Sequence, residues 1–186
     1  MLRGKGLSNY ISHILAVAIA FLILSLIASS MYDYYVDLTM ESQRSEAMAL
    51  SEDLGNKIMD MYSQYGDVEI IPQQGETEVL TSTEVDVPDD VGGRNYNLRL
   101  NSSRKHWIET DLEATAEVEV VDSRRPTARV VVEVTEFPEG TYKYHMYNIE
   151  TNMTGHVSNP RKVKLEYVRV NDGEVEDLIR MSRAGS

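Results

Sequence analysis

The sequence predicts an α+β protein in which one long N-terminal helix is followed by an antiparallel β-sandwich domain. Residues 7–32 contain no Asp, Glu, Lys or Arg, and no proline occurs before Pro72. After Gly66 the apolar periodicity changes from that of a helix to that of a strand. A series of strand-like segments then follows without a helical pattern among them, which is typical of a small β-sandwich.

The uncharged segment 7–31 is predicted to cross a membrane as a helix, because about 20 apolar residues are enough to span the hydrocarbon core. Arg3 and Lys5 precede the segment, whereas Asp33 and further acidic residues follow it. Basic residues stay on the cytoplasmic side, so the N-terminus is expected inside the cell and the C-terminal domain outside. A secretory signal peptide cleaved near Ser30 is the competing interpretation.

The helix is predicted to continue in water as far as Tyr65. Mainly apolar residues recur at every third or fourth position and form a stripe, which indicates that one face of the helix packs against another surface. Leu50–Tyr65 is expected to pack on the protein's own β-domain. For Val36–Ala47 two interpretations stay open, namely the same packing or a coiled coil with a partner. Gly66 fits a cap at the end of the helix. The stripe consists of Val36, Met40, Gln43, Ala47, Leu50, Leu54, Ile58, Met61 and Tyr65.

Alternating apolar and polar residues predict the strands of the β-domain. Segments 114–120 and 130–134 are expected to pair as a hairpin, and Trp107 is expected in the core. Residues 151–160 are predicted to be irregular, and the tail from Arg180 is predicted to lie outside the sheet. The predicted strands are 68–71, 78–87, 96–100, 106–108, 114–120, 130–134, 142–146, 163–167 and 175–179. The predicted domains are a leader 1–6, a membrane helix 7–31, an extracellular helix 32–66, a β-sandwich 67–180 and a tail 181–186.

Composition argues against several classes of function. The chain has 30 acidic and 18 basic residues and a formal net charge of −12, which disfavours a nucleic-acid partner because phosphate binding needs a basic surface. It has no cysteine, so thiolate catalysis and cysteine-based metal centres are excluded. Its four histidines lack metal-ligand spacing, and no phosphate loop or catalytic triad pattern occurs. The sequence therefore predicts no cofactor, no metal site and no enzymatic activity. Calcium binding stays open at the carboxylate clusters within 86–90 and 172–177, although neither has the spacing of an EF-hand.

A basic residue followed by glycine stands directly before the uncharged segment. The pair is Lys5-Gly6, with a second pair, Arg3-Gly4, just before it. This arrangement resembles the class III signal peptide of archaeal type IV pilin-like proteins. In that family a prepilin peptidase cuts after such a pair and the apolar helix stays attached, so the resemblance implies processing at Lys5, Gly6 and Leu7. Bacterial pilins carry Glu at the fifth mature position, where this chain has Ile11, and archaeal members often lack that Glu.

The resemblance implies a non-catalytic cell-surface subunit or accessory component of an archaeal type IV filament. Its partners would be a prepilin peptidase, other pilin-like subunits, the membrane, and components of the cell envelope or S-layer. Two alternatives stay open: a membrane-anchored binding or stator module that does not polymerise, and a secreted enzyme or carbohydrate-binding β-domain. Asn101 and Asn152 begin Asn-x-Ser/Thr triplets in predicted turns and are candidate glycosylation sites.

Overall fold

The computed structural model describes residues 4–103, 106–108, 118–120, 127–147, 149 and 151–185. Within these ranges the side chains are described except for those of residues 4–9, 103, 106–108, 118–120, 127 and 145–147. The chain divides into two compact units, Met1–Glu41 and Ser42–Ser186. They are named the N-terminal unit and the C-terminal unit below.

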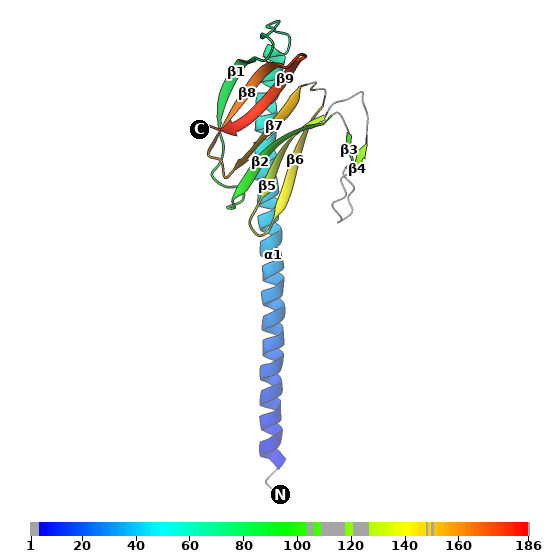
Figure 1. Ribbon diagram of the computed structural model, residues 1–186. Coiled ribbons are helices and arrows are strands. Elements are labelled where there is room, and N and C mark those ends of the chain that lie inside the picture. Colours follow the sequence, from blue (N-terminus) through cyan, green and yellow to red (C-terminus); the bar gives the residue numbers. More distant parts are fainter. Residues whose placement is uncertain are drawn as a thin grey trace. The chain divides into compact units, whose positions relative to one another are not determined.

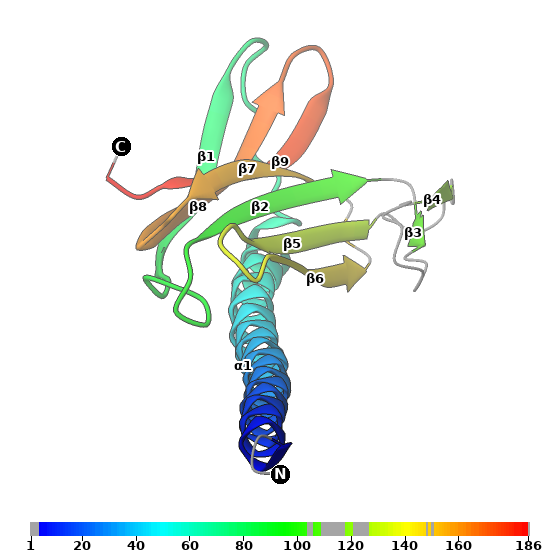
Figure 2. The same cartoon turned by 90° about the horizontal axis from the view of Figure 1, so that it is seen from below.

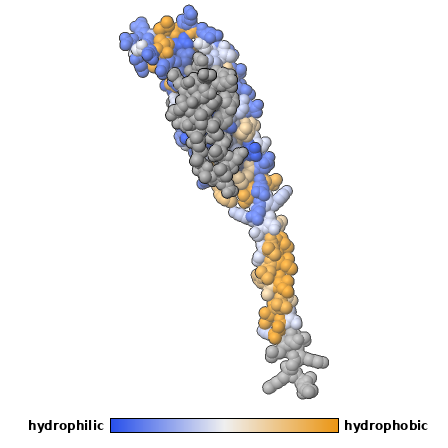
Figure 3. Space-filling model, turned by 90° about the vertical axis from the view of Figure 1, so that its right-hand side faces the viewer, coloured by the Kyte–Doolittle hydropathy of each residue, from blue (hydrophilic) through white to orange (hydrophobic). Residues whose placement is uncertain are grey.

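Helix α1 (Gly4–Tyr65) begins in the N-terminal unit and ends in the C-terminal unit. The absence of proline from this stretch leaves every backbone N–H available for the helical ladder. Side chains 10–35 are all exposed, and Figure 3 shows the apolar ones as an orange band along the helix. The hydroxyl of Ser25 donates to the backbone carbonyl of Phe21 at 2.9 Å, so this polar group is satisfied within the apolar segment.

Seven strands of the C-terminal unit form one mixed sheet, in the order β1-β8-β9-β7-β2-β5-β6 (Figures 1 and 2). Neighbouring strands are antiparallel except for β7 and β9, which are parallel. A separate ribbon pairs β3 (His106–Ile108) with β4 (Val118–Val120). The sheet strands are β1 (Thr77–Asp86), β2 (Tyr96–Ser103), β5 (Thr127–Val134), β6 (Gly140–Tyr147), β7 (Asn152–Ser158), β8 (Lys162–Asn171) and β9 (Val175–Arg183).

One face of the sheet packs against the last part of α1 (Figure 1). Successive side chains of a strand point to opposite faces, so Leu98 and Leu100 of β2 point toward the helix together with Val130 and Val132 of β5. On the helix side, the core cluster contains Ala47, Leu50, Leu54, Ile58 and Met61. The prediction that the stripe from Leu50 packs on the β-domain is therefore confirmed.

The α+β class is confirmed, but the antiparallel β-sandwich is not. The described strands give one mixed sheet and a short ribbon, and α1 covers the inner face of the sheet where a second sheet was expected. An alternating pattern shows that one face of a strand is buried, but it does not show what covers that face.

One predicted strand and one predicted irregular segment are wrong because of contacts distant in sequence. Residues 68–71 form no strand, since the carbonyls of Val68 and Ile70 accept hydrogen bonds from the Arg169 guanidinium. Residues 152–158, expected to be irregular, form β7. A glycine is needed in β7 because Gly155 has φ +146° and a Cβ there would collide with Met181.

Two further predictions about strands are also wrong. The sheet retains the chain as far as Arg183, so the tail from Arg180 is not loose. Val118–Val120 pairs with His106–Ile108, whereas β5 pairs with β2 and β6, so the expected hairpin between the two valine-rich segments does not form. Residues 114–117 and the side chain of Trp107 lie outside the described set.

A loop between β1 and β2 is fastened to α1 near the start of the C-terminal unit. The backbone N–H of Gly92 donates to the Glu46 carboxylate at 2.7 Å, and the Tyr96 hydroxyl donates to the Pro88 carbonyl at 2.7 Å. Gly92 has φ +59°, and a Cβ there would collide with the buried side chain of Gln43. Glycine is therefore required where this loop meets the helix.

Candidate functional site

The predicted processing residues lie in the first turns of α1. The backbone of Lys5, Gly6 and Leu7 is helical, since α1 begins at Gly4. Their side chains are outside the described set. Cleavage after Gly6 stays a prediction.

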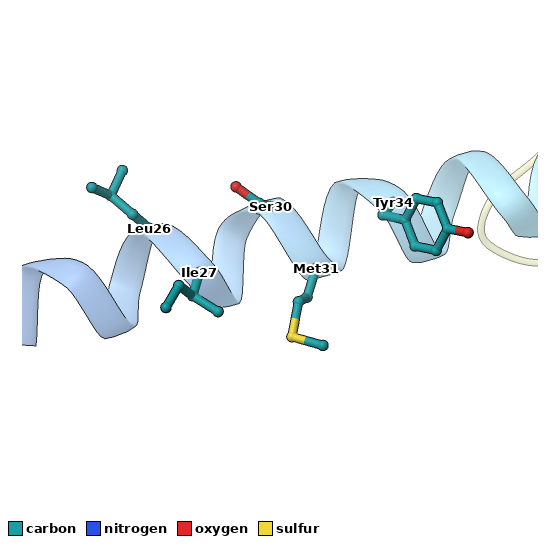
Figure 4. A pocket seen from close by; sticks show the side chains of 5 residues that line it. All are labelled: Leu26, Ile27, Ser30, Met31 and Tyr34. Carbon is teal, nitrogen blue, oxygen red and sulfur yellow. The ribbon is translucent and has the colours of Figure 1, made fainter.

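Helix α1 is long and apolar enough to be a candidate membrane span by length and composition, and the described part of the chain includes one such helix. On the surface of this helix, five of its own side chains line an open apolar hollow (Figure 4). A hollow formed by a single helix suits lipid chains or another helix, because apolar packing needs a second surface. Its lining residues are Leu26, Ile27, Ser30, Met31 and Tyr34.

The two glycosylation candidates lie in strands, so their predicted placement in turns is wrong. Asn101 is half-buried in β2, where it pairs with Arg129 on one side and Thr154 on the other. Asn152 is exposed at the first position of β7. Of the two side chains, that of Asn152 is therefore the more accessible to a modifying enzyme.

An ion pair between the buried Arg169 and the half-buried Asp177, which the sequence did not reveal, lies near the end of α1. The Arg169 guanidinium on β8 donates to both carboxylate oxygens of Asp177 on β9, from Nε at 2.6 Å and from Nη2 at 2.9 Å. The same guanidinium donates to the backbone carbonyls of Val68 and Ile70. The Tyr167 hydroxyl donates to Asp177 at 2.8 Å. Arg169 thus joins β8 to β9 through a bidentate pair and binds the loop that follows α1 through Nη1.

The environment of this pair shifts the pKa values of its members. Burial acts to raise the pKa of Asp177, but hydrogen bonds from Arg169 and Tyr167 and the charge of Arg169 outweigh it and lower that pKa. The hydrogen bond to Asp177 is the main cause of a raised pKa for Arg169. Burial, with Asp177 nearby, raises the pKa of Tyr167 to about 12. The three groups therefore keep their charge states near neutral pH.

A polar pocket of about 460 Å³ opens beside the ion pair. It is formed where the last turn of α1 and the residues after it meet the start of β7 and the β8–β9 hairpin. No periodicity in the sequence marks it, because its walls come from segments far apart in the chain. Its lining residues are Tyr62, Ser63, Gly66, Asp67, Thr151, Asn152, Arg169, Val175, Glu176 and Asp177.

Together these features define an α+β protein with one candidate membrane-spanning helix and a polar pocket in its C-terminal unit. Across the described residues, no group of three or more His, Asp or Glu side chains is arranged to hold a metal ion. Comparison with family models, with curated proteins and with solved structures gave no match. The proposals below rest on the chain's own residues.

Proposed function

We propose that this protein is a non-catalytic, pilin-like cell-surface subunit or accessory component of an archaeal type IV filament. The main supporting observation is that the two ends of α1 differ in the burial of their apolar side chains. Its side chains 10–35 are exposed and mainly apolar, whereas Leu50, Leu54 and Ile58 are buried in the core of the C-terminal unit. Such a helix serves both as an apolar assembly or membrane segment and as the support of a folded domain.

In this proposal Arg3 and Lys5 stay on the cytoplasmic side and the C-terminal unit lies outside the cell. The acidic composition suits a soluble exterior domain, since net charge opposes aggregation. The partners would be a prepilin peptidase, other pilin-like subunits, the membrane and components of the cell envelope. Ile11 in place of the Glu of bacterial pilins supports a second candidate, a membrane-anchored binding or stator module that does not polymerise.

The mature chain is expected to begin at Leu7. Replacement of Gly6 by Leu should leave the leader attached, because a peptidase site that accepts glycine at this position has no room for a large side chain. Mass spectrometry of the N-terminus checks both statements. Gly4→Leu serves as the matched control and should be processed like the wild type. A mature start at or after Ser29 would contradict the pilin-like proposal and favour a secreted domain.

Small residues on the apolar segment are expected to support helix–helix association. Ala16 and Ala20 are one helical turn apart and both exposed, and small residues let two helices approach closely. The double change to Leu should strongly reduce the complexes recovered by crosslinking in the envelope. Ile19→Leu, which changes shape but not size, is the control. If the double variant crosslinks like the wild type, the segment is an anchor only, and the non-polymerising module is the better interpretation.

A further inference from the structure

The polar pocket at the end of α1 has no part in the filament proposal. From its charge, its size and its rim, we propose that it binds a lysine or arginine side chain presented by a partner protein. The binding would take place at the face of the C-terminal unit formed by the loop after α1 and the β8–β9 hairpin. The proposal holds equally for a filament subunit and for a solitary anchor.

The charges of the pocket favour a cation. Asp67 and Glu176 line it and are exposed, and within the described part of the chain neither side-chain carboxylate has a hydrogen-bond or ion-pair partner. The carboxyl end of α1 also reaches the pocket through Tyr62 and Ser63, and that end of a helix dipole is negative. Two uncompensated carboxylates and a helix C-terminus together attract a positive group.

Among the described residues of the lining, one is basic, and its side chain already has partners. Arg169 donates from Nε and Nη2 to Asp177 and from Nη1 to two backbone carbonyls. A guanidinium has five N–H donors, so little of its donor capacity is left for a ligand. An anionic ligand would therefore meet two carboxylates without a free positive partner, which excludes phosphate and carboxylate groups.

The size of the pocket fits a side chain better than an ion. A pocket of about 460 Å³ is far larger than a bare metal ion, and the described residues offer no three-ligand cluster. The half-buried ring of Tyr62 forms part of the wall. An aromatic face adds to the binding of an organic cation, and the hydroxyl of Ser63 and the amide of Asn152 supply further polar groups. A guanidinium or alkylammonium matches this lining.

One apolar side chain lines the same pocket, and two more are exposed in the loop that follows α1. Val175 lines the pocket and is exposed, and Ile70 and Ile71 in the loop after α1 are exposed as well, Ile71 to 74%. Figure 3 shows orange residues among blue ones at the top of the view, the end where this loop lies in Figure 1. A partner segment with an apolar residue next to its basic residue would cover both features at once.

Hydrogen bonds from β8 fix the backbone of the loop that carries these isoleucines. Besides the bonds from Arg169, the Asn171 side-chain amide donates to the Pro72 carbonyl at 2.8 Å. The Gly75 N–H donates to the Asn171 carbonyl at 2.6 Å. A backbone fixed in this way loses little entropy on binding, which makes its apolar side chains effective contacts. The net charge of −12 disfavours another copy of the chain or an anionic lipid surface as the occupant and favours a basic partner.

The test uses the full chain in neutral detergent micelles and two fluorescent tripeptides, acetyl-Ala-Arg-Leu-amide and its glutamine analogue. The arginine peptide should bind and the glutamine peptide should bind at least about fivefold more weakly, since it lacks the charge. Glu176→Gln and Asp67→Asn should each weaken the arginine peptide by about two- to fivefold. Rising salt should weaken it further. Fluorescence anisotropy, with empty micelles as the blank, measures all of these.

Glu174→Gln is the matched control, because Glu174 is exposed in the same hairpin but does not line the pocket. It should leave the affinity within about twofold of the wild type. Equal binding of the two peptides would overturn the proposal. An equal loss for Glu174→Gln and Glu176→Gln would do so too, because it would reveal only a general negative field. The N-terminal processing result has no bearing on this outcome, so the two proposals fail separately.

Discussion

Replacement of Leu54 by Asp is expected to unfold the C-terminal unit. Leu54 is 0% exposed and lies in the core between α1 and the sheet. Truncating such a side chain to Ala costs about 2–5 kcal/mol, and a buried carboxylate without a partner adds a desolvation penalty to that loss. Because domains are stable by only about 5–15 kcal/mol, this single change should remove most of the folding free energy.

Limited proteolysis and near-UV circular dichroism of the full chain in detergent check this expectation. Far-UV circular dichroism is less suitable, because the N-terminal part of α1 contributes helical signal whether or not the C-terminal unit is folded. Asp60→Ala is the control, since Asp60 is exposed on the same helix. It should change the free energy of unfolding by no more than about 0.5 kcal/mol. A wild-type melting temperature for Leu54→Asp would show that the packing of α1 on the sheet is not essential.

The second large effect is expected from Arg169→Leu. The change leaves the carboxylate of Asp177 partly buried without its cation and leaves the carbonyls of Val68 and Ile70 without their donor. Because Asp177 is only partly buried, the cost should lie between the roughly 0–1 kcal/mol of an exposed pair and the roughly 3–5 kcal/mol of a fully buried one. The loop after α1 should also become accessible to proteases. Chemical denaturation of the full chain measures the first effect and limited proteolysis the second.

Arg180→Leu provides a matched comparison for the Arg169 variant. Arg180 also pairs with a carboxylate on the neighbouring strand, Glu166, at 2.8 Å. Its side chain is 46% exposed, and Glu166 keeps a second partner in Lys164 at 2.7 Å. Because the Arg180 side chain is half exposed and the buried Glu166 keeps Lys164, loss of this pair should cost about 1 kcal/mol. Similar losses for the two variants would contradict the structural role assigned to Arg169.

The lowered pKa of Asp177 also predicts how stability depends on pH. A carboxyl group whose pKa is lower in the folded state stabilises the fold above its unfolded pKa of about 3.9, and this stabilisation is lost as the pH falls through the folded value. The wild type should therefore lose stability below about pH 4. Glu166, whose pKa is lowered by Lys164 and Arg180, contributes to the same slope. Asp177→Asn should be less stable at neutral pH and show a shallower acid slope in denaturation experiments.

Local periodicity determined the elements that depend on neighbouring residues alone. The absence of charge and proline predicted α1, and the stripe through Leu54 and Ile58 predicted which face of it is buried. The alternation in 163–167 and 175–179 predicted the two strands that pair as the β8–β9 hairpin. In each case the decisive interactions join residues a few positions apart, which a linear sequence displays directly.

Only the tertiary structure decided the arrangement of the sheet and the candidate pocket. The parallel pairing of β7 with β9 joins segments that carry no mutual pattern in the sequence, and alternation did not show that the sheet is single and mixed. The Arg169 side chain and the Val68 carbonyl are 101 positions apart, and Asp67 and Glu176 meet at one pocket for the same reason. Sequence alone established the helix, its apolar half and most of the strands. The fold decided which polar groups come together, because that depends on how the whole chain packs and not on local spacing.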